Sequence, residues 1–85
     1  MKAKPMDLVE LREQKEWTQG EAARQIARVL KGKFDRTALS RFEHGERTPS
    51  FRVFVAMRRA YGVSADVLVD AFTTNRGENN AQAGR

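Results

Sequence analysis

The sequence predicts an all-α domain of five helices, and two observations support this prediction. Apolar residues recur at the spacing of a helix in five segments, and no stretch alternates convincingly with the two-residue period of a strand. Of the 85 residues, 40% are hydrophobic and 32% are charged, which is typical of a folded domain rather than a disordered or membrane-spanning chain. We therefore expect one domain over residues 1–72 and a flexible polar tail over residues 73–85.

The first two expected helices lie in the N-terminal third of the chain. The first spans about residues 5–15, with a proline in its first turn, where proline is tolerated. The second begins at a capping box, in which the Thr18 hydroxyl and the Glu21 carboxylate can each satisfy a free backbone N–H group. No glycine or proline interrupts its apolar face before Gly32, so this helix is expected to extend through Leu30.

The three remaining helices are delimited by residues that favour helix ends. Serine and aspartate accept hydrogen bonds from free N–H groups at a helix start, and glycine readily adopts the backbone conformation that ends a helix. These residues are Asp35 and Gly45 for the third helix (residues 36–43), Ser50 and Gly62 for the fourth, and Ser64 for the fifth, which is expected to end near Phe72.

The positive charge of the chain is concentrated in its middle. Residues 24–59 contain ten Lys or Arg against three Asp or Glu, whereas the segments before and after each contain one more acidic than basic residue. Such a concentration is expected of a protein that binds a polyanion, although a solvated charged face would have the same composition. Cysteine is absent, which excludes disulfides, cysteine-based zinc sites and thiol nucleophiles.

The third helix has two sharply different faces. At 100° per residue, its apolar residues fall on one side and its polar residues on the other. The apolar side contains Ala38, Leu39 and Phe42, and the polar side contains Arg36, Thr37, Ser40 and Arg41. The fork of an arginine matches the two acceptors of guanine, and hydroxyl groups contact bases or phosphates. By itself, this pattern also fits an ordinary amphipathic surface helix.

Four short motifs, taken in order, resemble the Xre/Cro-type helix-turn-helix family over roughly residues 6–70. They are Thr18-Gln19 at the start of the second helix, Ser40-Arg-Phe-Glu-His-Gly45 at the end of the third, Pro49-Ser50 before the fourth, and Gly62-Val-Ser64 before the fifth. The resemblance implies a five-helix, lambda-repressor-like domain that places residues 36–43 in the major groove of duplex DNA. It further implies a transcriptional regulator, with repression as the expected sign.

The resemblance also assigns roles to individual residues. It implies base contacts from the polar side of the third helix, that is, from Arg36, Thr37, Ser40 and Arg41. It implies phosphate contacts from Gln19 and Arg47, although on spacing alone Gln19 is equally a plain surface residue. It pairs Arg12 with Glu43 in a partly buried ion pair that joins the first and third helices.

The sequence departs from the family pattern at three places. Ala27 replaces the usual glycine that stops the second helix, and about six additional residues precede Phe34, which predicts a longer second helix and a longer turn. Arg58 replaces a small buried alanine, which leaves open a snorkelling side chain, a partner contact or an altered core. An outward patch of Val53, Ala56 and Val67 is either a dimer interface or merely an apolar surface.

The additional turn has to be interpreted from its own residues. Lys31 and Lys33 directly precede the third helix, so they are placed to reach phosphates that flank the groove. A solvated loop is the alternative. His44, next to the glycine that ends the third helix, is interpreted as a solvent-facing residue, with phosphate contact as the alternative.

The remaining classes of function are less consistent with the sequence. An enzyme is not expected, because the chain has one histidine and no cysteine, and no cofactor or metal is implied. The expected partner is double-stranded DNA; a homodimer, a toxin that would make the protein an autoregulating antitoxin, and another protein bound to the same fold stay open. No membrane association is expected, and the N-terminus lacks the apolar core of a signal peptide, so a cytoplasmic location in a prokaryotic or phage-infected cell is expected.

Overall fold

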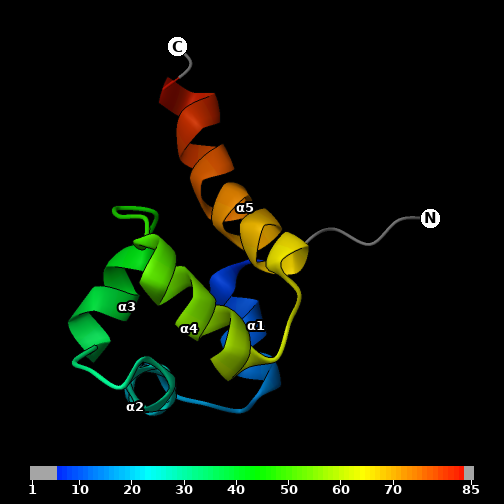
Figure 1. The fold of residues 1–85 in the computed structure, drawn as a ribbon. Coiled ribbons are helices and arrows are strands. Elements are labelled where there is room, and N and C mark those ends of the chain that lie inside the picture. The colour runs from blue at the N-terminus through cyan, green and yellow to red at the C-terminus, as the bar shows by residue number, and fades with distance from the viewer. Residues whose placement is uncertain (1–5, 84–85) are drawn as a thin grey trace.

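The computed structural model describes residues 6–83, with side chains through Thr74, and folds them into five α-helices without strands (Figure 1). The helices are α1 (Leu8–Gln14), α2 (Gln19–Leu30), α3 (Arg36–Glu43), α4 (Phe51–Tyr61) and α5 (Ala65–Ala83). In Figure 1, α4 crosses the centre of the molecule and the other helices surround it. The predicted all-α fold is confirmed. In the described part of the chain, no helix is long and apolar enough to cross a membrane.

Helix α1 begins later than the sequence suggested. Its N-cap is Asp7, whose carboxylate accepts a hydrogen bond from the Glu10 backbone N–H at 2.9 Å, while the Glu10 carboxylate accepts one from the Asp7 N–H. This reciprocal capping box fixes the first helical residue at Leu8. The expected start at Pro5 is therefore wrong, although Pro5 itself lies outside the described residues.

Helix α2 extends through Leu30, as predicted, but its first turn forms only half of the expected capping box. The Thr18 hydroxyl accepts from the Glu21 N–H at 3.1 Å, whereas the Glu21 carboxylate instead accepts from the side chains of Arg24 and Gln25. The hydrogen bonds from Gln25 and Arg24 lower the pKa of Glu21. The Glu21 carboxylate therefore bonds to side chains in the next turn of α2 and not to the backbone N–H of Thr18.

The turn between α2 and α3 spans residues 31–35 and contains an unusual backbone conformation. Lys31, rather than the expected Gly32, adopts the left-handed conformation, with φ of 58°. Non-glycine residues rarely adopt this conformation because their Cβ crowds the backbone. The longer turn predicted from the sequence is therefore present, and its first residue is strained.

The caps and stops of the later helices are as predicted, with one exception. Asp35, Ser50 and Ser64 each accept from a backbone N–H three residues ahead, at 2.9 to 3.3 Å. Gly45 and Gly62 have φ of 75° and 70°. However, α5 continues to Ala83 and does not end near Phe72. No proline interrupts residues 73–83, so each further residue can add a backbone hydrogen bond to a helix that has already formed.

The core lies between α4 and the helices around it, and its main contact is α2 against α4. Its fully buried side chains include Leu8, Ile26, Leu39, Met57, Tyr61 and Leu68. Ala56 belongs to this core with 3% exposure, so the predicted outward patch is wrong at that position. Val53 is half-buried against the same core, and only Val67 of the three is exposed. Arg58 is half-buried, consistent with a side chain that extends along the core surface.

Candidate nucleic-acid interface

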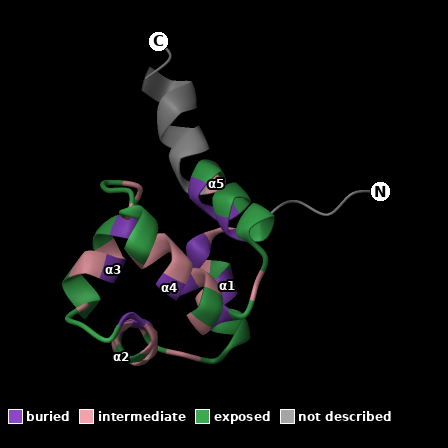
Figure 2. Cartoon of the chain, in the orientation of Figure 1, coloured by how far each residue is buried: buried purple, intermediate pink, exposed green. Residues whose placement is uncertain are grey.

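The two faces of α3 are present as predicted. Leu39 and Phe42 are buried against the core, while Arg36, Thr37 and Arg41 are exposed. Asp35 caps the first turn, and Gly45 ends the helix through its positive φ. Local sequence and core packing together therefore determine which side of α3 faces the solvent (Figure 2).

The exposed face of α3 forms one wall of a hollow of about 410 Å³. Its lining residues are Gln19 from the start of α2, Arg36, Thr37, Ser40 and Arg41 from α3, and His44 and Glu46 from the loop that follows. The structure thus brings together the four residues predicted to contact bases and one of the predicted phosphate contacts. Lys31, Lys33 and Arg47 are exposed but do not line this hollow.

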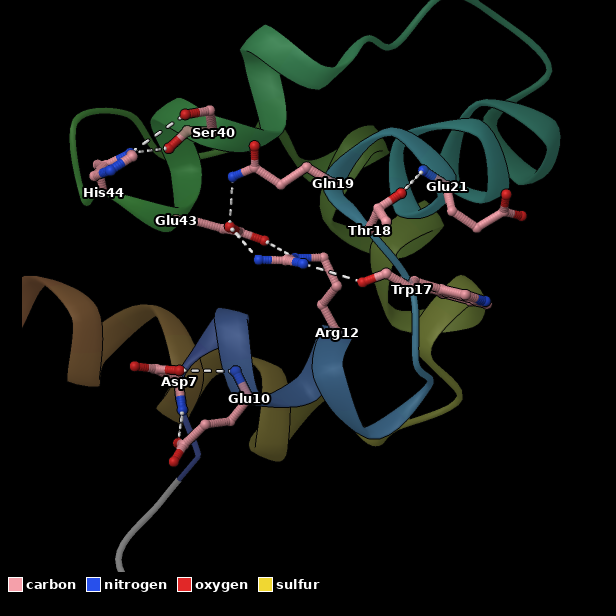
Figure 3. Close-up of polar contacts among 10 residues, drawn as sticks. All are labelled: Asp7, Glu10, Arg12, Trp17, Thr18, Gln19, Glu21, Ser40, Glu43 and His44. Carbon is pink, nitrogen blue, oxygen red and sulfur yellow. Dashed lines mark hydrogen bonds and ion pairs between the residues drawn. The ribbon is translucent and has the colours of Figure 1, made fainter.

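His44 faces the solvent in the turn after α3, as the sequence predicted, and it also lines this hollow. It is exposed, and its Nδ1 lies 2.7 Å from the Ser40 carbonyl oxygen and 3.3 Å from the Ser40 hydroxyl (Figure 3). When Nδ1 carries the proton, it donates to that carbonyl, which also accepts from the His44 backbone N–H at 3.0 Å. The spacing of four residues from Ser40 was the sequence signal for this contact.

Glu46 also lines the hollow, and the sequence analysis did not single it out. Its backbone N–H donates to the Arg41 carbonyl at 2.9 Å, which turns the chain back beside α3. A search of the sequence for basic residues does not find Glu46, because its side chain is acidic. Carboxylates can accept a hydrogen bond from the amino group of cytosine, so Glu46 is chemically compatible with a base-reading surface.

A buried polar network connects the end of α3 to α1 and α2, and it contains the predicted Arg12–Glu43 ion pair (Figure 3). Arg12 Nε donates to Glu43 at 2.7 Å, Nη2 donates to the other carboxylate oxygen at 3.2 Å, and Nη1 donates to the Trp17 carbonyl at 3.0 Å. The two side chains are only 13% and 3% exposed. The hydrogen bond to Glu43 raises the pKa of Arg12, so the guanidinium stays charged.

Gln19 extends this network to the start of α2. Its amide nitrogen donates to Glu43 at 2.8 Å, so Glu43 accepts from two different helices. This bond orients the Gln19 side chain at the edge of the hollow. The residue predicted to contact a phosphate therefore also joins α2 to α3, a role that spacing alone did not reveal.

The cations of the exposed face are not neutralised by the protein. Among the residues whose side chains are described, the two ion pairs use Arg12 and Arg24, neither of which lies on α3. Arg36 and Arg41 are exposed and lie in the segment that holds most of the net positive charge. Exposed, unpaired cations on one face attract polyanions.

The model of the helix-turn-helix domain family matches residues 8–72, which is most of the chain and covers α1 through the first part of α5. The chain belongs to this family. Domains of this class bind DNA. In this chain, α2 and α3 are consecutive helices joined by a turn, which is the arrangement of a helix-turn-helix pair. Neither the search of the curated proteins nor the search of the solved structures gave a match.

Proposed function

We propose that the protein is a transcriptional repressor of the Xre/Cro type, which recognises a specific duplex sequence by placing α3 in the major groove. One observation supports this most directly: α3 presents Arg36 and Arg41, unpaired and exposed, on the wall of a hollow that begins at the N-terminus of α2. In a helix-turn-helix, the second helix reads base edges while the first meets the backbone.

The proposal divides the contacts into two kinds. Arg36, Thr37, Ser40 and Arg41 contact base edges and determine the sequence. Gln19 and Arg47, together with Lys31 and Lys33 in the turn before α3, contact phosphates and add affinity without selecting a sequence. These four side chains around α3, exposed or half-buried, thus bind the DNA backbone while α3 contacts the bases in the major groove.

The first experiment is a selection of duplexes from a random pool, followed by binding measurements across a salt series. Affinity should fall steeply as salt rises, because contacts to phosphates release condensed counterions. Selected duplexes should converge on one sequence. No duplex affinity at low salt, even with the selected pool, would contradict DNA binding and favour a protein-interaction module on the same fold.

Two variants separate the kinds of contact. Arg41→Ala should weaken binding to the selected duplex by about 1 to 3 kcal/mol more than binding to random duplex, because a bidentate contact to guanine is lost. Arg47→Ala should weaken binding to both duplexes equally and make the affinity less dependent on salt. Lys15→Ala, which changes an exposed cation at the end of α1, is the matched control and should leave both affinities unchanged. A change of specificity from Arg47→Ala alone would reverse these assignments.

The turn residues are tested by the double variant Lys31→Ala/Lys33→Ala. It should lose affinity equally on selected and random duplexes, with a salt slope shallower by up to about two units. An unchanged slope in a folded variant would make residues 31–35 a purely structural insertion.

A further inference from the structure

A second hollow lies between α2 and α4 and shares no lining residue with the hollow beside α3. It encloses about 330 Å³ and is lined by Val29, Leu30, Phe51, Arg52, Val55, Ala56 and Arg59. Phe51 is 82% exposed, far more than any other large apolar side chain in the described part of the chain. We call this hollow the α2/α4 groove. An exposed apolar groove of this kind is typical of a binding surface.

The rim of the α2/α4 groove is positively charged. Arg52 donates from Nη2 to the Leu30 carbonyl at 3.2 Å, which holds its guanidinium over the end of α2. Arg59 lies two turns further along α4 and is exposed. Because Arg52 is already ordered, an acidic partner would not have to immobilise it, which favours binding. The groove therefore suits an apolar side chain flanked by carboxylates.

The chain itself presents such a surface on α5. Asp66, Val69, Asp70 and Thr73 recur at the three- and four-residue spacing of one helix face, and all four are exposed. Val69 is 48% exposed, whereas Leu68, Ala71 and Phe72 of the same helix are buried in the core. One valine between two aspartates thus faces the solvent. We call these four residues the α5 stripe.

We propose that the α2/α4 groove of one copy binds the α5 stripe of a second copy. Val69 would pack between Phe51 and Val55, and the aspartates would face Arg52 and Arg59. The two arginines lie about 10 Å apart along α4 and the two aspartates about 6 Å apart along α5, a difference that long arginine side chains span. Groove-to-groove packing would instead place like charges together. Where the groove and the stripe of one copy both meet those of a second copy, two such contacts close a symmetric dimer.

Sedimentation of the full chain without DNA tests this proposal. The wild-type chain should dimerise as its concentration rises. Arg59→Asp and Asp70→Arg should each raise the dissociation constant about tenfold or more, because each places like charges across the contact. An equimolar mixture of the two variants should dimerise again, because both of its contacts then join opposite charges. Glu13→Arg, a charge reversal on the exposed side of α1, is the control and should not change dimerisation.

Two results would overturn the proposal. One is a wild-type chain that stays monomeric up to millimolar concentration, and the other is a dimer that both reversals leave unchanged. Circular dichroism of each variant shows whether it is folded, and the mixing experiment rescues association only if both variants are. The test uses no DNA, so its failure leaves the proposed DNA binding intact.

Discussion

The two ends of α3 are held in place by different physical means. At its C-terminal end, Glu43 is 8% exposed and accepts hydrogen bonds from Arg12 of α1 and Gln19 of α2. These bonds are directional, and the two from Arg12 join opposite full charges. The end of α3 is thereby fixed at one orientation relative to two other helices.

At its N-terminal end, α3 has no such network. Asp35 caps its own helix, and Phe34, just before the helix, packs partly buried against the core with its ring 5.8 Å from the ring of Phe42. The chain reaches this point through Lys31 in its left-handed conformation. Apolar contacts are not directional, so this end is positioned by packing alone. The comparison indicates that the C-terminal end defines the orientation of α3, and the N-terminal end, which carries Arg36 and Thr37 of the proposed base contacts, is more easily displaced.

The largest effect is expected at the C-terminal end. Glu43→Ala should lower the free energy of unfolding by about 3 to 5 kcal/mol, because it leaves the guanidinium of Arg12 buried without its carboxylate. Urea unfolding measures the loss. In the double variant Arg12→Met/Glu43→Leu, no charge is left unpaired, and most of the stability should return. A double variant that is less stable than either single variant would contradict this account.

A smaller effect is expected at the N-terminal end. Phe34→Ala should lower the free energy of unfolding by about 2 kcal/mol, because its half-buried side chain packs against the core and the ring of Phe42. Phe34→Leu should recover more than half of that loss, since apolar packing tolerates a change of shape. If Phe34→Ala were as damaging as Glu43→Ala, the two ends would not differ as described.

The substitution Tyr61→Phe tests how the buried surroundings of the polar network affect stability. The Tyr61 hydroxyl is buried and has no hydrogen-bond partner among the residues that the structure describes, so Tyr61→Phe should stabilise the protein by about 1 kcal/mol. Burial, with the nearby charge of Glu43, also raises the pKa of Tyr61 above its ordinary value of about 10. A pKa raised by folding contributes stability that is present below pH 10 and lost as the pH rises further. Urea unfolding at pH 7 and above pH 10 should show this loss in the wild type and less of it in the variant.

The smallest effect is expected at Lys31. Lys31→Gly should raise the free energy of unfolding by up to about 1 kcal/mol, because glycine adopts the left-handed conformation without crowding. Lys33→Gly is the matched control: Lys33 has no positive φ, so glycine there should only loosen the unfolded chain and lower stability slightly. Equal effects at the two positions would show that no strain is concentrated at Lys31.

The helices and the face of α3 could be predicted because they depend on neighbours within one or two turns. Thr18, Asp35 and Ser50 accept from backbone groups three residues ahead, and Gly45 and Gly62 adopt positive φ, all of which follow from residue type. The extension of α2 through Leu30 followed from an uninterrupted apolar face. The expected end of α5 near Phe72 is wrong, because the polar residues that follow do not interrupt the helix, which continues to Ala83.

The sequence by itself determined the helices and the polar face of α3, because these arise from interactions between residues close together in the chain. Only the tertiary structure decided which side chains from distant segments share the surface beside α3, where Gln19 lines one hollow with His44 and Glu46. It likewise decided that Ala56 is buried and that Arg52 closes the end of α2. Such contacts depend on how the helices pack, and many pairings of similar free energy are compatible with the same local pattern until the core selects one.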